Sequence, residues 1–172
     1  MTAKKQSNNA IDLLINDHTL VRQLFKQYEK IHESASSDEK QELAEQICNE
    51  FLLHADIEEQ FFYPAAREAL EKGDLIDEAE VEHASARDLV AQLQAMQPDD
   101  PMYDAKVRVL GEYIEHHVEE EEKEMFPKVK KTKIDLEGMA EEMMQAKETA
   151  KPGFLAGSDK GKGKGHGRST RA

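Results

Sequence analysis

The chain contains one motif twice: a histidine followed four residues later by a glutamate and ten residues later by a proline. The two copies are His54, Glu58 and Pro64, and then His117, Glu121 and Pro127. Residues four apart lie on the same face of a helix. Each copy therefore predicts a helix that presents an imidazole and a carboxylate together, and two such helices facing each other would offer ligands for two metal ions.

A lone histidine stands upstream of each motif, preceded by an acid and followed four residues later by an arginine. These units are Asp17-His18 with Arg22, and Glu82-His83 with Arg87. The copies also match at Glu59 and Glu122, and at Tyr63 and Phe126. An internal repeat constrains the architecture before any other feature does. This one predicts two related helical hairpins that pack with pseudo-twofold symmetry.

The composition favours helix over sheet. Charged residues make up 34% of the 172 residues and aromatic residues only 6%, and a chain rich in Glu, Lys, Ala and Leu forms helices readily. The hydrophobic fraction of 38% is low, but a four-helix bundle needs only one apolar stripe on each helix. We therefore expect an all-α fold built on a four-helix bundle.

Capping and breaking residues set the expected helix limits. The first helix should start near Ala10, and the second should follow Ser37 as its N-cap and continue to about Glu71. Pro64 should bend this second helix or loosen its hydrogen bonding. The third helix should start at Asp74 and end before Pro98, and the fourth should be capped by Asp100, with Pro101 in its first turn, and end near Pro127.

The domain organisation follows from these limits. We expect a flexible N-terminus over residues 1–9 and a four-helix bundle over residues 10–131. Residues 132–151 have amphipathic spacing and form either a fifth helix laid on the bundle or a frayed extension. Residues 152–172 are rich in Gly and Lys, so we expect a disordered basic tail, since such a segment buries too little apolar surface to fold.

Six residues are expected to bind metal because each histidine and each motif glutamate lies on the apolar stripe of its helix. An ionised carboxylate buried without a partner costs many kcal/mol, and two would repel each other. A cation relieves both penalties, and a mixed shell of imidazole and carboxylate suits iron, and also manganese or zinc. A bundle without metal is the structural alternative. The expected ligands are His18, His54, Glu58, His83, His117 and Glu121.

Two neighbouring residues are left open. His116 precedes His117 but lies about 100° round the helix from it, so we expect it to be exposed or to lie behind the ligands. Tyr113 stands one turn before His117 and could reach the site or pack against the core, and packing is the preferred interpretation.

Several partner classes are disfavoured by the same sequence. The formal net charge of −13 argues against binding nucleic acid, and the basic tail is read as a solubilising end. No stretch approaches the roughly 20 apolar residues of a membrane span, and the N-terminus lacks the apolar core of a signal peptide. With Cys48 as its single cysteine, the chain is expected in the cytoplasm.

At these motifs the chain resembles the hemerythrin family, specifically the bacterial hemerythrin-like proteins with an HHE cation-binding domain. The resemblance covers about Ile11 to Lys130. It implies an up-down four-helix bundle around a non-heme diiron centre with an oxo or hydroxo bridge. On this resemblance Glu58 and Glu121 bridge the irons, and the terminal ligands are His18, His54, His83 and His117.

One position departs from the family pattern. Oxygen-carrying hemerythrins have a further histidine one turn before the position of His83, where this chain has Ala79, with Glu80 beside it. Without that histidine nitrogen, one iron has a coordination position that stays open or is filled by Glu80 or water. Reversible carriage of dioxygen is therefore not the default expectation.

Together these observations predict a diiron protein that binds or reacts with dioxygen, peroxide or nitric oxide, in oxygen handling or in redox or iron stress. Two alternatives remain at this point. One is an iron-sensing or iron-handling interaction module, in which metal occupancy controls helix stability. The other is a diiron enzyme with catalase-like or peroxidase-like turnover. The sequence does not identify a protein partner.

Overall fold

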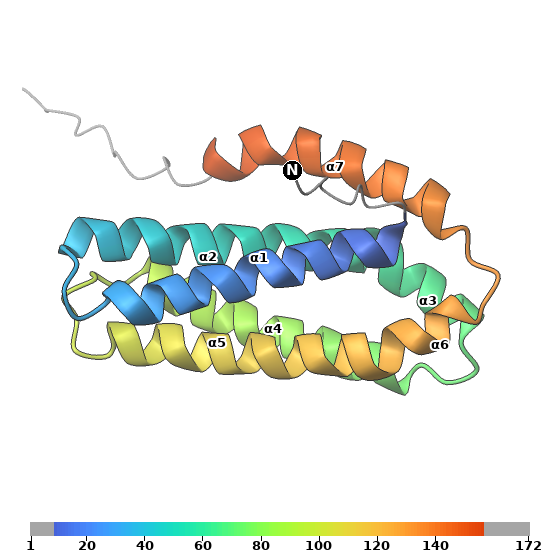
Figure 1. Ribbon diagram of the computed structural model, residues 1–172, viewed down its shortest axis with the longest axis horizontal. Helices are drawn as coiled ribbons and strands as arrows, with labels where there is room; N and C mark the ends of the chain where they lie inside the picture. The colour runs from blue at the N-terminus through green and yellow to red at the C-terminus, as the bar shows by residue number, and fades with distance from the viewer. Residues whose placement is uncertain (1–8, 157–172) are drawn as a thin grey trace, which may run out of the picture.

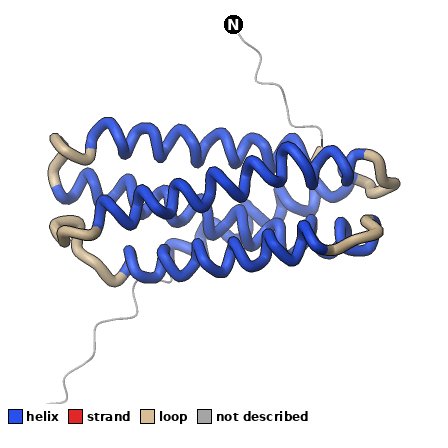
Figure 2. Tube along the Cα trace, turned by 90° about the horizontal axis from the view of Figure 1, so that it is seen from below, coloured by secondary structure: helices blue, strands red, loops and turns tan. Residues whose placement is uncertain are grey.

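Helices make up nearly all of the molecule. The computed structural model describes residues 9–156, with side chains up to residue 150. Within that part of the chain it contains helices and no strand, with the loops gathered at the two ends (Figure 2). No helix in this range is long and apolar enough to cross a bilayer.

Four helical rods run alternately up and down, side by side (Figure 1). The first rod is α1 (Ala10–Ile31), and the second joins α2 (Ser37–Ile57), η1 (Glu58–Phe62) and α3 (Tyr63–Ala69). The third is α4 (Asp74–Gln94), and the fourth joins α5 (Tyr103–Glu120), η2 (Glu121–Met125) and α6 (Phe126–Lys130). The expected all-α, up-down four-helix bundle is confirmed.

The helix ends follow local capping chemistry. Ser36 caps α2 through a capping box with Glu39, one residue before the expected cap at Ser37. The third rod begins at Asp74 as expected. The expected cap of the fourth rod at Asp100 is wrong, because its carboxylate accepts a hydrogen bond from the backbone of Gln97 in the preceding turn. The helix consequently begins at Tyr103.

Each motif glutamate begins a π-helical turn that ends just before the motif proline. In η1 the backbone N–H of Tyr63 donates to the carbonyl of Glu58, five residues earlier, and in η2 Phe126 donates to Glu121 in the same way. A proline has no N–H to donate and its ring crowds the carbonyl four residues back. One wider turn accommodates that loss, which is the local loosening expected at Pro64, and such turns are frequent at functional sites.

The apolar core is divided into two clusters along the bundle. One cluster includes Leu24, Tyr28, Leu43, Leu93 and Leu110. The other includes Ile11, Phe62, Ile76 and Met125, together with Met143 of α7. On each rod the buried histidines and glutamates lie between the residues of the two clusters. The polar layer is thus enclosed at both ends by packed hydrocarbon.

Helix α7 (Leu136–Ala156) is the additional helix, and it lies on α1 and α2 (Figure 1). It buries Met139, Ala140 and Met143 against that pair. It continues to Ala156, so the expected break at residue 152 is corrected: Pro152 removes one backbone donor and can bend a helix without ending it. Of the expected flexible N-terminus over residues 1–9, residues 1–8 lie outside the described residues, as does the tail from residue 157 onward, and Asn9 caps α1.

Leu110→Ala should destabilise the bundle without changing the polar layer. Leu110 is fully buried in the cluster formed mainly by α1, α2, α4 and α5. Removing its side chain should leave a cavity and lower the free energy of unfolding by about 2–5 kcal/mol. Chemical denaturation measures this loss. Val81→Ala, at a side chain that is 66% exposed, should change stability by less than about 0.5 kcal/mol.

Candidate metal centre

The six expected ligands lie together in the polar layer, and all are buried. Their exposed fractions run from 0% for Glu58 to 5% for His54. They come from all four rods: α1, the α2–η1 junction, α4 and the α5–η2 junction. Each glutamate lies on the same inward face as the histidine four residues before it, because the segment that joins them is α-helical.

The imidazoles converge in two pairs. His18 Nε2 lies 3.2 Å from His54 Nε2, and His83 Nε2 lies 3.0 Å from His117 Nε2. In every ring the other nitrogen, Nδ1, faces a carboxylate. With Nδ1–H donating outward, each Nε2 turns a lone pair toward its partner. Two facing lone pairs repel, so a proton or a metal ion must lie between them.

Each buried glutamate reaches both imidazole pairs. Glu58 Oε1 lies 3.1 Å from His54 Nε2, and its Oε2 lies 3.2 Å from His83 Nε2. Glu121 Oε2 lies 3.2 Å from His18 Nε2, and its Oε1 lies 3.4 Å from His117 Nε2. Each buried carboxylate therefore spans the two imidazole pairs.

Two of these carboxylate oxygens are suited to binding a cation. Glu58 Oε1 and Glu121 Oε2 are buried and have no hydrogen-bond partner, and both face the first imidazole pair. A buried charged oxygen without a partner is strongly unfavourable. The side chains fall into two groups suited to holding a metal, and they share Glu58. The groups are His18, His54, Glu58 and Glu121, and then Glu58, His83 and His117.

A second layer of acids orients the imidazoles. Here these acids are called the outer carboxylates: Asp17, Glu59, Glu82 and Glu122. His18 Nδ1 lies 2.9 Å from Glu122, His54 Nδ1 3.1 Å from Asp17, His83 Nδ1 2.8 Å from Glu59 and His117 Nδ1 2.7 Å from Glu82. Carboxylates in this position fix the tautomer and orientation of metal-binding histidines and raise their basicity. The acid before each upstream histidine, and the acid after each motif glutamate, therefore have a common role.

Three outer carboxylates are themselves paired with a permanent cation. Arg22 donates to Glu122, and Arg87 donates to Glu59. Lys147 of α7 donates to Asp17. The two arginines that recur in the sequence repeat therefore support equivalent acids in the two halves of the bundle.

The electrostatics of the centre strongly favour positive charge. Burial lowers the pKa of His54, but the charge of Glu58 and the hydrogen bond to Asp17 outweigh it and raise the pKa to about 10. Burial raises the pKa of Glu58, yet the positive charge of His54 and the nearby imidazoles of His117 and His83 hold it well below its usual range. Protons and a metal ion compete for the same positions.

Tyr63 is a polar residue of the centre that the sequence analysis did not single out. Its hydroxyl donates to Glu121 Oε1 at 2.6 Å and lies 3.1 Å from Glu58 Oε2. It is also 3.3 Å from His83 Nε2. Burial, followed by the two glutamate charges, raises the pKa of Tyr63 well above normal. The Tyr63 hydroxyl therefore lies among the candidate metal-binding side chains and is hydrogen-bonded to both buried glutamates. Its repeat partner is Phe126, which gave no signal of a polar role.

The residues left open in the sequence lie away from the centre. Glu80 pairs with Arg67 at 3.2 Å and does not fill the gap beside Ala79. Tyr113 is 47% exposed, so it neither reaches the centre nor packs in the core. His116 is exposed and contacts Glu82 and Glu120.

Comparison with known proteins decides the family. The family model described as the hemerythrin HHE cation-binding domain matches residues 9–129. The chain belongs to the hemerythrin HHE cation-binding family. Membership implies metal binding, and the histidine and glutamate clusters described above are where this HHE domain can provide it.

Individual relatives agree with that assignment. The crystal structure of an HHE domain-containing protein from Mycobacterium kansasii, a homologue of Rv2633c, superposes with a TM-score of 0.67 at 26% identity, covering 87% of this chain and 98% of the other. The uncharacterized protein Rv2633c of Mycobacterium tuberculosis is 30% identical over 139 residues, which is 78% of this chain and 83% of that protein.

A third relative is much longer than this HHE domain. A protein of Nostoc sp. named DNA nickase is 30% identical over 126 residues, covering 73% of this chain. The chain spans only 35% of the length of that relative.

Asp17→Asn should weaken metal binding while leaving the ligands in place. The change keeps the size of the side chain but removes the charge that His54 Nδ1 faces at 3.1 Å. Loss of such a supporting acid should lower metal affinity by about 10–100-fold, measured by competition with a chromophoric chelator. Glu29→Gln removes one charge from the far end of α1 and should leave the affinity unchanged. Equal affinities for the two variants would contradict the orienting role of Asp17.

Proposed function

We propose that this protein is a non-heme diiron protein that binds or reacts with a small oxidant: dioxygen, peroxide or nitric oxide. The proposed ligands are His18, His54, Glu58, His83, His117 and Glu121. The observation that carries the proposal is the reach of each buried carboxylate, which places one oxygen at each imidazole pair. A single metal ion would leave one pair of facing imidazole nitrogens, and the carboxylate oxygens beside it, without a cation.

The donor set favours iron over other metals. Four imidazole nitrogens and two carboxylates form a mixed shell typical of iron, manganese or zinc rather than of calcium or magnesium. A structural zinc ion would be satisfied by four ligands, whereas six groups converge here and Tyr63 adds a further oxygen. When bound, two iron ions would supply electrons to a small oxidant. The surrounding chain orients the imidazoles through the outer carboxylates and limits water.

The space beside the centre suits only a small molecule. A cavity of about 10 Å³ is lined by Ala79, His117, Glu121 and Met125, among others, and that volume corresponds to roughly one water molecule. Ala79 is 3% exposed and offers only a methyl group there. Dioxygen, peroxide and nitric oxide are all of a size that small side-chain movements at this position could admit.

One contact favours iron sensing as the second candidate function. Lys147 of α7 pairs with Asp17, and Asp17 accepts a hydrogen bond from His54. Occupancy of the centre would therefore be coupled to the position of α7 on the bundle. This function predicts weak, exchangeable iron and a large fall in melting temperature on chelation. Reaction with an oxidant instead predicts tightly held iron whose spectrum changes when the oxidant is added.

The double variant Glu58→Ala, Glu121→Ala tests the proposed centre. Wild-type protein, loaded with ferrous iron without oxygen and then exposed to air, should hold about two irons per chain and show near-ultraviolet charge-transfer bands. The variant lacks both carboxylates that reach the two imidazole pairs, so it should lose most of the iron and those bands. Iron analysis and absorption spectroscopy measure both effects.

The matched control is Glu42→Ala, Glu112→Ala, which removes two exposed glutamates from α2 and α5. It should keep the iron content and spectrum of the wild type. An unchanged spectrum in the Glu58, Glu121 variant, or zinc as the metal held by wild-type protein after ferrous loading, would overturn the diiron proposal.

A further inference from the structure

A second cluster of metal-binding side chains lies outside the centre, on the α4–α5 face. Glu82, His116 and Glu120 each present one ligand atom within 4.8 Å of the others. His116 Nε2 is 3.2 Å from Glu120 Oε1 and 3.4 Å from Glu82 Oε1. Donor atoms bound next to each other on a cation at about 2.1 Å are separated by about 3 Å. His116 Nε2 is therefore near coordination spacing from both carboxylates, and the three side chains are partly open to solvent.

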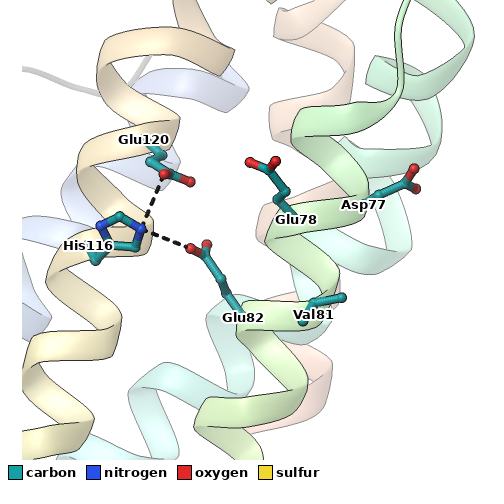
Figure 3. Close-up of a pocket in the computed structure, with 6 residues that line it drawn as sticks. All are labelled: Asp77, Glu78, Val81, Glu82, His116 and Glu120. Carbon is teal, nitrogen blue, oxygen red and sulfur yellow. Dashed lines mark ion pairs between the residues drawn. The ribbon is translucent and has the colours of Figure 1, made fainter.

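These side chains line a groove between the two helices (Figure 3). Its volume is about 410 Å³, and Asp77, Glu78 and Val81 complete the lining. The carboxylate of Glu78 extends from α4 toward the α5 wall that carries Glu120 and His116 (Figure 3). The groove thus gathers acids around one imidazole.

The charges in this groove are not balanced as they are elsewhere around the centre. The other three outer carboxylates pair with Arg or Lys, whereas Glu82 has His117 on one oxygen and His116 on the other. Within residues 9–150, no Lys or Arg lies within ion-pair distance of Glu78, Glu82 or Glu120. The groove therefore places three carboxylates around His116 with no permanent cation from the described part of the chain beside them, an arrangement to which a divalent cation would bind.

The pseudo-twofold repeat shows that this face differs from its counterpart. Counting from the motif histidines, His116 corresponds to Leu53 and Glu120 corresponds to Ile57. Leu53 and Ile57 are buried, in the cluster that also contains Met143 of α7. One half of the bundle is therefore apolar and covered at these positions, and the other half is polar and open.

A small cavity joins the groove to the buried centre. The cavity of about 10 Å³ beside Ala79 shares Glu82 and Glu120 with the groove, and it also touches His117 and Glu121 of the centre. Glu121 is 1% exposed, and its Oε1, on the His117 side, accepts a hydrogen bond from Tyr63. Glu82 and Glu120 therefore line both the solvent-facing groove and the small space beside the proposed ligands His117 and Glu121.

We propose that Glu82, His116 and Glu120 form a second, outer site for a divalent transition-metal cation, which collects ferrous iron at the mouth of the path to the centre. Imidazole with carboxylates suits ferrous iron, manganese and cobalt. The outer site stands on its own geometry, whereas its role in delivery rests on the proposed diiron function. Because α7 covers the equivalent positions of the other half, delivery is expected from the α4–α5 face alone.

The first experiment counts manganese on protein whose centre is already filled with iron. Free Mn²⁺ is followed by electron paramagnetic resonance while it is titrated against the full chain. Wild-type protein should bind one more cation per chain than the double variant His116→Ala, Glu120→Gln, in which affinity at this site should fall at least about tenfold. Glu119→Gln removes a neighbouring exposed charge and is the matched control, expected to bind like wild type.

The second experiment follows uptake of ferrous iron by metal-free protein in stopped flow, with iron below one equivalent. The double variant should load several-fold more slowly and still reach the wild-type iron content, because the six proposed ligands are intact. Equal manganese binding by wild type and double variant would overturn the outer site, and equal loading rates would overturn the delivery role. Failure of the diiron proposal is recognised separately, as a low iron content in wild-type protein.

Discussion

Two carboxylates at the centre of an apolar bundle are the constraint on which the rest of this structure depends. Glu58 and Glu121 are 0% and 1% exposed, and they face each other across four imidazoles. Ionised acids in such a place are tolerated only with a cation or several protons close by. The paired Nε2 atoms, the orphaned carboxylate oxygens and the raised pKa of His54 are consequences of this one requirement.

The residues around the two buried carboxylates position the imidazoles and shield the centre from water. Helical spacing places each motif glutamate on the inward face, and the π-helical turn that begins there accommodates the following proline. Four outer carboxylates hold the imidazoles by Nδ1, and three of these acids are fixed in turn by Arg22, Arg87 and Lys147. The apolar clusters on both sides restrict water, which strengthens every charge interaction within the layer. The fourth acid, Glu82, is the exception, and the asymmetry it creates distinguishes the open face of the bundle from the face covered by α7.

Much of this arrangement was predictable because it depends on the sequence spacing of the repeated histidines, glutamates and prolines. A histidine and a glutamate four residues apart, repeated with matching prolines, fixed which helix faces point inward and placed all six residues in one layer. The acids beside His18 and His83 were visible as part of the repeat, although their contact with the histidines of other helices was not. Helix limits were predicted less well at Asp100, whose carboxylate accepts from the preceding turn instead, and at Pro152, which does not end α7.

Other features depend on three-dimensional contacts that no local pattern encodes. Tyr63 was aligned with Phe126 as an aromatic match, and only the fold shows that its hydroxyl lies between Glu58 and Glu121. Likewise, Lys147 is far from Asp17 in sequence, and their ion pair depends on the packing of α7 against the bundle. His116 was separated from the ligands correctly by its angle on the helix, but its contacts with Glu82 and Glu120 required the α4–α5 groove to be seen.

The central claim is that two metal ions share the buried carboxylates, and Mössbauer spectroscopy of protein loaded with ⁵⁷Fe and exposed to air tests it most directly. Two bridged ferric ions should couple antiferromagnetically to a diamagnetic ground state. Their spectrum at low temperature should consist of quadrupole doublets, and in an applied field the only magnetic splitting should be that caused by the applied field. Magnetically split spectra of isolated ferric ions, at about one iron per chain, would show a mononuclear site and contradict the account.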